Sequence, residues 1–379
     1  MNKHILIIPS WYPTKESKIS GSFFREQAQA LKHHHQVGVI YPQFRPMRKL
    51  KQLFGGQYGL DIEDDAGVTT LRWYDVVWIP RNKPYYRFAW VRNNLKLFEA
   101  YQKRYGLPDV IHVHSMLKAG IVAKRIKDMY GIPYVVTEHS SRIFNKQVDK
   151  QEEAFMSDII QYSDANIAVS QVFSEKLHRD WGGDWHVIPN MVWDKFLKHP
   201  IAEDKPRQKP FTYINVSVIK DIKRKGLIDL IQGFAQEFTD EDNVRLCLGG
   251  GGAGYNKLQK YINEQKLSNR VQLLGALSRE EVIKYIAASE AFVLASHYEP
   301  FGVVVIESLA LGKPVVATRC GGPEDIITKS NGLLVPIQSP YELGQAMRKI
   351  KDNIAQYNPH TIREDCANRF SEESVVSQI

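Results

Sequence analysis

The sequence predicts an α/β protein built from two doubly wound domains, and three observations support this. First, its 379 residues exceed the usual size of one core and suit two domains of roughly 150–200 residues. Second, short β-branched runs alternate with amphipathic helical patterns, which indicates parallel sheets covered by helices on both faces. Third, a charged, proline-containing stretch at 194–210 interrupts this alternation and is typical of a linker.

The first half of the chain carries six predicted strands. They lie at 4–9, 36–42, 110–115, 133–140, 165–170 and 186–190. Helical patterns fall between them at 21–35, 119–131, 151–163 and 171–182. Gly131 and then Pro133 mark the end of one helix and the start of the next strand. We therefore expect an N-terminal domain over residues 1–193.

A second alternation follows the linker. Its predicted strands lie at 211–219, 244–250, 271–276, 291–296, 314–319 and 332–336. Ser278 and Glu281 have the spacing of a capping box, and Gly312 with Pro314 is typical of a helix end. We expect a C-terminal domain over 211–355, a tail over 356–379 that returns to the N-terminal domain, and a ligand cleft between the two domains.

Composition narrows the class of protein. Fifty basic residues against 42 acidic ones give a net charge of +8, which favours anionic partners such as nucleotide phosphates or a lipid surface. The cysteines at 247, 320 and 366 are too far apart in the sequence for a CxxC pair, so a reducing, cytoplasmic location is expected. No apolar run approaches the roughly 18 residues of a spanning helix.

Two glutamates, Glu299 and Glu307, bracket an apolar run that begins a predicted helix. The first N–H groups of that helix, near Gly302 and Val303, can bind an anion without any side chain. Taken singly, each glutamate could be an ordinary charged helix position. Together they fit a ligand with phosphate in its middle and hydroxyls at both ends, as in a nucleotide-sugar.

The segment EPFGVVVIE, residues 299–307, resembles the E-x7-E motif of retaining glycosyltransferases with the GT-B fold, in particular family 4, the glycosyl transferases group 1. The resemblance runs nearly end to end. It includes the N-terminal strand and glycine loop, PSWYPTKESKISGSFFREQAQAL, and the two histidine-bearing strands, PDVIHVHS and PYVVTEHS. The implied architecture is two Rossmann-like domains.

The resemblance implies roles in binding a nucleotide-sugar donor. Glu299 would hold sugar hydroxyls with the backbone of Phe301 and Gly302, and Glu307 would accept hydrogen bonds from the ribose. Backbone N–H groups at 302–304, including that of Val303, would meet the diphosphate.

A basic pair is also part of the family's pattern, on the first loop of the C-terminal domain. Lys225 followed by Gly226 matches its second element. The first element is usually an arginine, and no arginine stands at the expected place here. Lys220 is our best candidate for it, and Lys223 and Arg224 are further candidates that could share the role.

Further donor-site positions follow from the same resemblance. Gly250 and Gly251, in a run of four glycines, correspond to a turn near the nucleotide. Gly21, His114 and His139 lie in the N-terminal domain, and His114 would approach the transferred sugar. A lone buried histidine or a glycine run is otherwise often structural.

The implied reaction is metal-independent, retaining transfer with no cofactor beyond the nucleotide-sugar substrate. Lys225 and Lys220 would supply the positive charge that a metal supplies elsewhere. The acidic triplet 63–65 is expected in a surface loop, away from the donor. We assign catalytic roles to Glu299, Lys225 and His114 and expect no metal site.

Two basic segments with interspersed apolar residues, at 41–56 and 81–98, lie in the domain expected to bind the acceptor. Such segments can rest on an anionic membrane surface, or they can be ordinary surface elements. In the first case Arg48, Lys49 and Lys51 would bind the inner face of the plasma membrane, and the acceptor would be a glycan or lipid-linked molecule of cell-surface polysaccharide synthesis.

Two alternatives share this architecture: a nucleotide-sugar 2-epimerase and a non-catalytic, two-domain binding protein. An epimerase would need acid/base carboxylates at the sugar and no acceptor. A nucleic-acid binder is not expected, because the basic residues are scattered and no binding motif is present.

Overall fold

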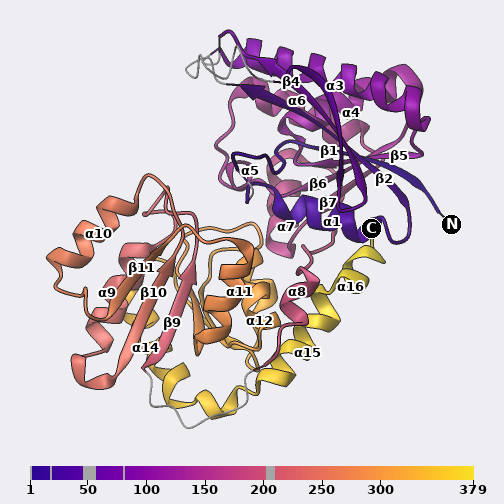
Figure 1. Cartoon of the computed structure of the whole chain (residues 1–379). Helices are drawn as coiled ribbons and strands as arrows, with labels where there is room; N and C mark the ends of the chain where they lie inside the picture. The colour runs from indigo at the N-terminus through magenta and orange to yellow at the C-terminus, as the bar shows by residue number, and fades with distance from the viewer. Residues whose placement is uncertain (1, 18, 46–56, 80–81, 202–209) are drawn as a thin grey trace. The chain divides into compact units, whose positions relative to one another are not determined.

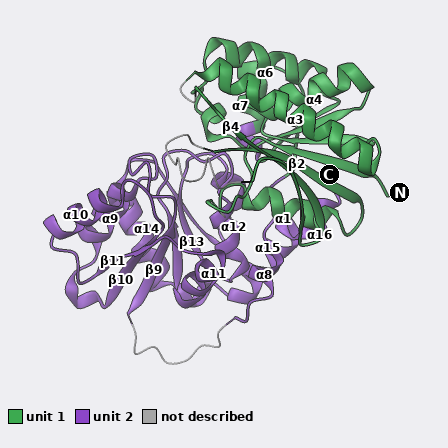
Figure 2. Cartoon of the chain, turned by 45° about the horizontal axis from the view of Figure 1, so that its top comes forward, with its two compact units in different colours: residues 1–169, 174–188 green, residues 170–173, 189–379 purple. Residues whose placement is uncertain are grey.

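The computed structural model describes residues 2–17, 19–45, 57–79, 82–201 and 210–379. These form two compact units, shown in Figures 1 and 2. Unit 1 comprises residues 1–169 and 174–188, and unit 2 comprises 170–173 and 189–379. Of the predicted linker, Asp194–Leu197 forms helix α8 within unit 2, and 202–209 lie outside the described residues.

Unit 1 contains an eight-stranded sheet in the order β3-β4-β2-β1-β5-β6-β7-β8. The strands are β1 His4–Pro9, β2 Gln36–Arg45, β3 Gly59–Asp65, β4 Val68–Val76, β5 Val110–His114, β6 Tyr134–Glu138, β7 Ala165–Ala168 and β8 Trp185–Val187. All neighbouring pairs run parallel except β3 and β4, which are antiparallel. The six predicted strands are present.

The hairpin formed by β3 and β4 was not predicted. The expectation that residues 63–65 form a surface loop is wrong, because they lie in strand β3 at the edge of the sheet. Ala66 and Gly67 form the turn with positive φ angles of 54° and 84°, as two-residue hairpin turns require. Glu63 pairs with the buried guanidinium of Arg72 on β4, 2.6 Å away.

The helices of unit 1 include those predicted by periodicity. They are α1 Ser22–Leu31, α3 Lys83–Tyr105, α4 Met116–Tyr130, α5 Ser141–Phe144, α6 Lys150–Tyr162 and α7 Gln171–Trp181, of which residues 171–173 are assigned to unit 2. The basic, aromatic segment 81–98 lies largely in α3, which buries Trp90, Leu97 and Phe98. Part of its aromatic content therefore belongs to the core of unit 1.

Unit 2 contains a six-stranded, fully parallel sheet in the order β11-β10-β9-β12-β13-β14. The strands are β9 Phe211–Val216, β10 Val244–Gly249, β11 Val271–Gly275, β12 Ala291–Leu294, β13 Val315–Thr318 and β14 Gly332–Val335. All six coincide with predicted strands, and most of them are short runs of buried apolar residues; β11, at the edge of the sheet, is buried only at Val271.

The helices of unit 2 are α8 Asp194–Leu197, α9 Leu227–Glu237, α10 Tyr255–Glu264, α11 Arg279–Ala288, α12 Val303–Ala310, α13 Pro323–Ile326, α14 Pro340–Asp352, α15 Pro359–Phe370 and α16 Glu372–Val376, with 3-10 turns at Asp240–Asp242 and Ile354–Gln356. The predicted capping box of Ser278 and Glu281 begins α11 and is confirmed. Gly312, with a φ of 71°, follows α12 as predicted.

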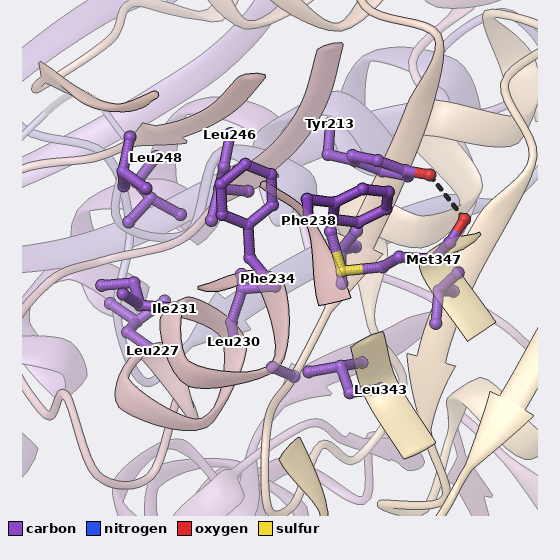
Figure 3. Packing of buried hydrophobic residues seen from close by; sticks show 14 of the residues in the cluster. Tyr213, Leu227, Leu230, Ile231, Phe234, Phe238, Leu246, Leu248, Leu343 and Met347 are labelled. Carbon is purple, nitrogen blue, oxygen red and sulfur yellow. Dashed lines mark hydrogen bonds between the residues drawn. The ribbon is translucent and has the colours of Figure 1, made fainter. Parts of the chain in front are cut away.

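A hydrophobic core in unit 2 joins α9, α14 and the sheet (Figure 3). Phe234 of α9 and Phe238, directly after this helix, pack beside Tyr213 of β9, whose hydroxyl donates to the backbone oxygen of Met347, 2.5 Å away. The helix α9 can approach α14 closely because Gly233 has no Cβ to meet the backbone of Pro340.

The C-terminal helices belong to unit 2. In α15, Phe370 packs edge-on against Phe301, and the thiol of Cys366 contacts the backbone oxygen of Ile306 at 3.3 Å. The backbone oxygen of Phe370 also accepts from the N–H of Val192 at 2.8 Å. That the tail over 356–379 also returns to the N-terminal domain stays a prediction.

The strand order fixes one switch point in each unit, where successive strands turn to opposite sides of the first strand. In unit 2 this point lies between β9 and β12, and in unit 1 it lies between β1 and β5. Ligands of doubly wound sheets bind beyond the carboxyl ends of the strands at such points. The residues that follow these four strands are therefore the first place to look for a site.

Candidate functional site

Glu299 lies in the loop after β12, at the switch point of unit 2. Its backbone N–H donates to the oxygen of Cys320 at 2.8 Å, and its own backbone oxygen accepts from the N–H of Gly322 at 2.9 Å. This bridge ties the loop after β12 to the loop after β13. The side chain is 13% exposed, so its carboxylate is held in place yet still reaches the surface.

Lys225 comes from the loop after β9, on the other side of the same switch point, and its ammonium forms an ion pair with Glu299. Ser296 Oγ donates to the same carboxylate oxygen at 3.0 Å, and Arg224 lies 4.0 Å from it. The structure therefore brings the predicted residues Lys225 and Glu299 together. Burial opposes ionisation of Glu299, but the positive charge of Lys225 outweighs it and holds the pKa below its usual value.

Gly226 explains why the lysine is followed by glycine. Its φ of 58° lies in the left-handed region, and a Cβ there would overlap the carbonyl oxygen of Ala295. The loop after β9 can thus lie directly against the end of β12 only with glycine at this position. His297 stabilises the same contact. Its backbone N–H donates to the backbone oxygen of Arg224 at 2.8 Å, and its ring Nε2 lies 2.7 Å from Oδ2 of Asp229.

Helix α12 begins beside Glu299, with Gly302 at its N-cap in a left-handed conformation (φ 100°) and no side-chain cap among the described residues. The N–H groups of Val303 and Val304 therefore retain the capacity to bind an anion, whereas that of Val305 donates to the backbone oxygen of Gly302 at 2.8 Å. The side chain of Phe301 points into the core against Phe370, so only its backbone is available to a ligand.

Glu307, on the second turn of α12, is 1% exposed and forms an ion pair with Arg279 at the start of α11. The guanidinium of Arg279 also lies over the rings of Trp193 and Phe196, at 5.6 and 5.0 Å from their centroids. The second carboxylate oxygen of Glu307 has no hydrogen-bond partner within the described residues. An orphan acceptor of this kind costs about 1–3 kcal/mol unless a ligand satisfies it.

The glycines at 250 and 251 have a packing reason of their own. Gly250 has a φ of 138°, and a Cβ there would overlap the carbonyl oxygen of Ser217 in the loop after β9. Gly251 accepts from the N–H of Ile219 at 3.0 Å. The turn after β10 is therefore held against the loop that carries the exposed side chain of Lys220. The roles of Gly250, Gly251 and Lys220 in donor binding stay predictions.

In unit 1, His114 ends β5 at the switch point. The ring is fully buried, stacks on Phe24 of α1 at 4.6 Å, and its Nδ1 lies 3.2 Å from Nε2 of His139. Gly21 caps the same helix α1 with a φ of 76°. The predicted residues Gly21, His114 and His139 thus gather at one end of the sheet, joined through α1.

Burial, together with the neighbouring imidazoles of His112 and His139, lowers the pKa of His114 well below its usual value. Its ring is therefore neutral at physiological pH. Its Nε2 is buried and has no hydrogen-bond partner within the described residues. The neighbouring carboxylate of Glu138 accepts instead from Ser115 Oγ and from the N–H groups of Met116, His139 and Ser140.

Several residues of this arrangement were missed by sequence reasoning. Arg279, Ser296 and His297 contact the predicted carboxylates or the loops that hold them. Nothing in the sequence marks Arg279 as the partner of Glu307, whereas Arg224, which lies 4.0 Å from Glu299, was among the basic residues considered for this loop. Among the described residues, no cluster of three or more His, Cys, Asp or Glu side chains could hold a metal ion.

The sequence is similar to those of known proteins along most of its length. The family model of Glycosyltransferase Family 4 matches residues 20–194, and that of Glycosyl transferases group 1 matches residues 201–365. The putative teichuronic acid biosynthesis glycosyltransferase TuaC of Bacillus subtilis is 27% identical over 366 residues, covering 91% of this chain and 88% of TuaC. The N-acetyl-alpha-D-glucosaminyl L-malate synthase of Bacillus anthracis is 28% identical, covering 71% of this chain and 73% of that enzyme.

Solved structures show the same fold. Sucrose-phosphate synthase from Thermosynechococcus elongatus aligns with a TM-score of 0.80 at 23% identity, covering 99% of this chain and 97% of that one. Anabaena Alr3699/HepE in complex with UDP aligns with a TM-score of 0.73 at 20% identity, covering 99% and 98%. With two α/β units and two family matches that together span most of its length, the chain belongs to the group 1 glycosyltransferases of the GT-B fold.

Proposed function

We propose that this glycosyltransferase transfers a sugar, with retention of anomeric configuration and without a metal ion, from a UDP- or GDP-sugar. The acceptor is a glycan or lipid-linked molecule of cell-surface polysaccharide synthesis. The observation that carries the proposal is the Lys225–Glu299 pair beside the uncapped start of α12 at the switch point of unit 2.

Each group suits one part of a nucleotide-sugar. Glu299 presents a carboxylate for sugar hydroxyls, and the N–H groups of Val303 and Val304 bind the diphosphate. The carboxylate oxygen of Glu307 that lacks a partner among the described residues accepts from a ribose hydroxyl. The complexes of Anabaena Alr3699/HepE with UDP and with UDP-glucose support a uridine nucleotide donor. Lys220, Gly250 and Gly251 line the same side of the sheet, on the loops after β9 and β10.

In the proposed reaction, the bond between the anomeric carbon and the diphosphate oxygen breaks while a bond to the acceptor hydroxyl forms on the same face of the sugar. The acceptor proton passes to the departing diphosphate oxygen. Negative charge grows on the diphosphate as it departs, so Lys225 and the start of α12 stabilise the transition state more than the bound donor.

His114 has the properties of a neutral hydrogen-bonding group. Its buried Nε2 lacks a partner among the described residues, and its pKa is lowered by burial. We propose that Nε2 contacts the transferred sugar and that His139, 3.2 Å from Nδ1, together with the stacked Phe24, orients the ring. Gly21 permits the entry into α1 that places Phe24 there.

The acceptor class rests on the similarity to a teichuronic acid biosynthesis enzyme and on the net charge of +8. Among the described residues, the structure has no helix that is long and apolar enough to cross a bilayer. We propose a cytoplasmic protein that binds the inner face of the plasma membrane peripherally. Arg48, Lys49 and Lys51, predicted to make this contact, lie outside the described residues.

The first experiment is a thermal-shift panel with UDP-, GDP- and ADP-sugars, in which the true donor raises the melting temperature. Turnover of that donor is then followed with and without an extract of lipid-linked glycans. Transfer that requires the acceptor supports the proposal. Isomerised donor without any acceptor would instead indicate an epimerase, and binding without turnover in either case would indicate a binding protein.

The stereochemical outcome is tested separately by proton NMR of the product. An anomeric coupling constant that matches the donor supports retention, and the opposite anomer refutes it. Activity after dialysis against EDTA tests the absence of a metal requirement.

A further inference from the structure

Lys118 of α4 is a half-buried lysine whose ammonium has no anionic partner among the described residues. Its Nζ lies 5.6 Å from the ring centroid of Tyr86 and 5.2 Å from that of Trp90, two residues one turn apart on α3. It makes no hydrogen bond or ion pair within the part of the chain that the structure describes. Contact with two aromatic faces stabilises a cation but leaves its hydrogen-bonding capacity unused.

Other lysines that lie over aromatic rings in the described residues do not share this situation. Four of them also pair with a carboxylate: Lys124 with Asp128, Lys127 with Asp164, Lys176 with Asp180 and Lys195 with Glu280. Lys96 lies over Trp73, and its side chain is exposed to water. Lys118 therefore combines partial burial with the lack of a carboxylate partner.

The charged neighbours of Lys118 do not supply an anion. Arg142, whose positive charge acts on Lys118, donates to Glu152 at 3.0 Å and to the backbone oxygen of Gln147 at 2.9 Å. Glu138 already accepts from four donors of its own surroundings. Burial, and after it the charge of Arg142, lower the pKa of Lys118 to about 8, in keeping with the lack of a carboxylate partner among the described residues.

The position of Lys118 points to a ligand. It lies on the first turn of α4, four residues after His114 at the carboxyl end of β5, beside the switch point of unit 1. Arg142 lies in α5, directly after the neighbouring strand β6. Phe44, at the carboxyl end of β2, packs against Tyr86, with 5.3 Å between the ring centroids, and extends the aromatic surface beside Lys118. All of these residues belong to unit 1.

We propose that Lys118, together with Arg142 and against the ring of Tyr86, binds an oxyanion carried by the acceptor of the reaction. This oxyanion is either a phosphate or a carboxylate. The inference rests on the proposed function in one respect, that the ligand of unit 1 is the acceptor. An acceptor with an acidic group gains a charge-assisted hydrogen bond from an ammonium that is already desolvated. A neutral acceptor gains only an ordinary hydrogen bond, so Lys118 determines specificity for charge.

The test uses three small probes that share a sugar ring: glucose 1-phosphate, glucuronate and glucose. Saturating UDP is present throughout, so that unit 2 does not compete for the phosphate. Acetylation of Lys118 by an N-hydroxysuccinimide ester at pH 8 is measured by peptide mass spectrometry. Lys124, on the same helix and also over a ring but paired with Asp128, is the internal control.

At a probe concentration about ten times its dissociation constant, mass action predicts a roughly tenfold slower acetylation of Lys118. We expect this protection from glucose 1-phosphate or from glucuronate, and the more effective of the two identifies the source of the oxyanion. Glucose should give no protection, and the acetylation of Lys124 should not change. Equal protection of both lysines, or protection by glucose alone, would overturn the proposal.

Calorimetry on variants provides a second measurement that does not depend on amine reactivity. Lys118→Met keeps the apolar stem and should weaken the anionic probe about tenfold or more, whereas Lys118→Arg keeps the charge and should stay within about threefold of the wild type. If Lys118→Met binds the probes as the wild type does, no oxyanion site exists there. UDP affinity, measured in the same samples, reports separately on the proposed donor site.

Discussion

The ion pair between Lys225 and Glu299 can be tested by a double-mutant cycle. Lys225→Met removes the cation and keeps much of its apolar stem, and Glu299→Gln removes the charge and keeps the shape of the side chain. Each side chain is 13% exposed in the folded protein, so removal of either partner leaves the other largely desolvated. The double variant, Lys225→Met with Glu299→Gln, leaves no uncompensated charge at this place.

The magnitude follows from the surroundings of Glu299. Loss of one partner of a buried ion pair costs about 3–5 kcal/mol. The lower end applies here, because Arg224 lies 4.0 Å from the carboxylate and Ser296 still donates to it. For a unit of this size, about 3 kcal/mol corresponds to a fall of roughly 6–12 °C in the melting temperature of unit 2. The double variant should recover most of that fall.

The assay is scanning calorimetry without nucleotide, repeated across pH. The pKa of Glu299 is lowered in the folded protein, so the pair stabilises the fold above the ordinary glutamate pKa of 4.5 and stops doing so as pH falls through the folded pKa. In Lys225→Met the burial of Glu299 remains without its cation, and the carboxyl takes up a proton more readily. The deficit of this variant should therefore be full at neutral pH and shrink below about pH 4.5.

Two results would refute this reasoning. A melting temperature for Lys225→Met within about 1 °C of the wild type at pH 7 would mean that the ion pair contributes little to folding. A double variant that melts at the sum of the two single effects would mean that the two side chains are not coupled.

Glu307→Ala should weaken UDP binding by about 1.5–3 kcal/mol in calorimetry, because a charge-assisted hydrogen bond to the ribose is lost; unchanged affinity in a folded variant would contradict the assignment. Lys225→Ala should lower turnover more than donor affinity, and wild-type transfer should survive treatment with EDTA. Loss of transfer in EDTA that magnesium restores would refute the role given to Lys225. Charge reversal of Arg48, Lys49 and Lys51 should reduce cosedimentation with anionic liposomes in a salt-dependent manner, at roughly 1 kcal/mol for each basic residue. A wild-type protein that stays in the supernatant at low salt would rule out this membrane contact.

The sequence by itself determined the two α/β units, because hydrophobic periodicity is a local property. Most of the parallel strands are short buried runs, the edge strands β8 and β11 excepted, and the amphipathic helices repeat their apolar residues every three or four positions. The hairpin of β3 and β4 was not predicted, because the acidic residues at 63–65 made strand β3 resemble a surface loop in composition. The alternating segment Val68–Val76 and the Ala66–Gly67 turn would have indicated it.

The resemblance of the motif around Glu299 placed the predicted residues near strand ends, and the structure assigned their partners. Lys225 and Glu299 are 74 positions apart, and Arg279 and Glu307 are 28 apart. No sequence spacing relates such pairs, because they meet only once the strands have taken their order in the sheet.

The same reason applies to Lys118. Its neighbours in the sequence, MLKAG, indicate an unremarkable turn at the start of a helix. Only the packing of α4 against α3 lays its ammonium over Tyr86 and Trp90, and only the fold leaves it without a carboxylate partner in the part of the chain that the structure describes. Periodic burial can be predicted from the sequence because it depends on near neighbours, whereas the balance of charge at a site depends on which distant side chains the fold brings within a few ångströms.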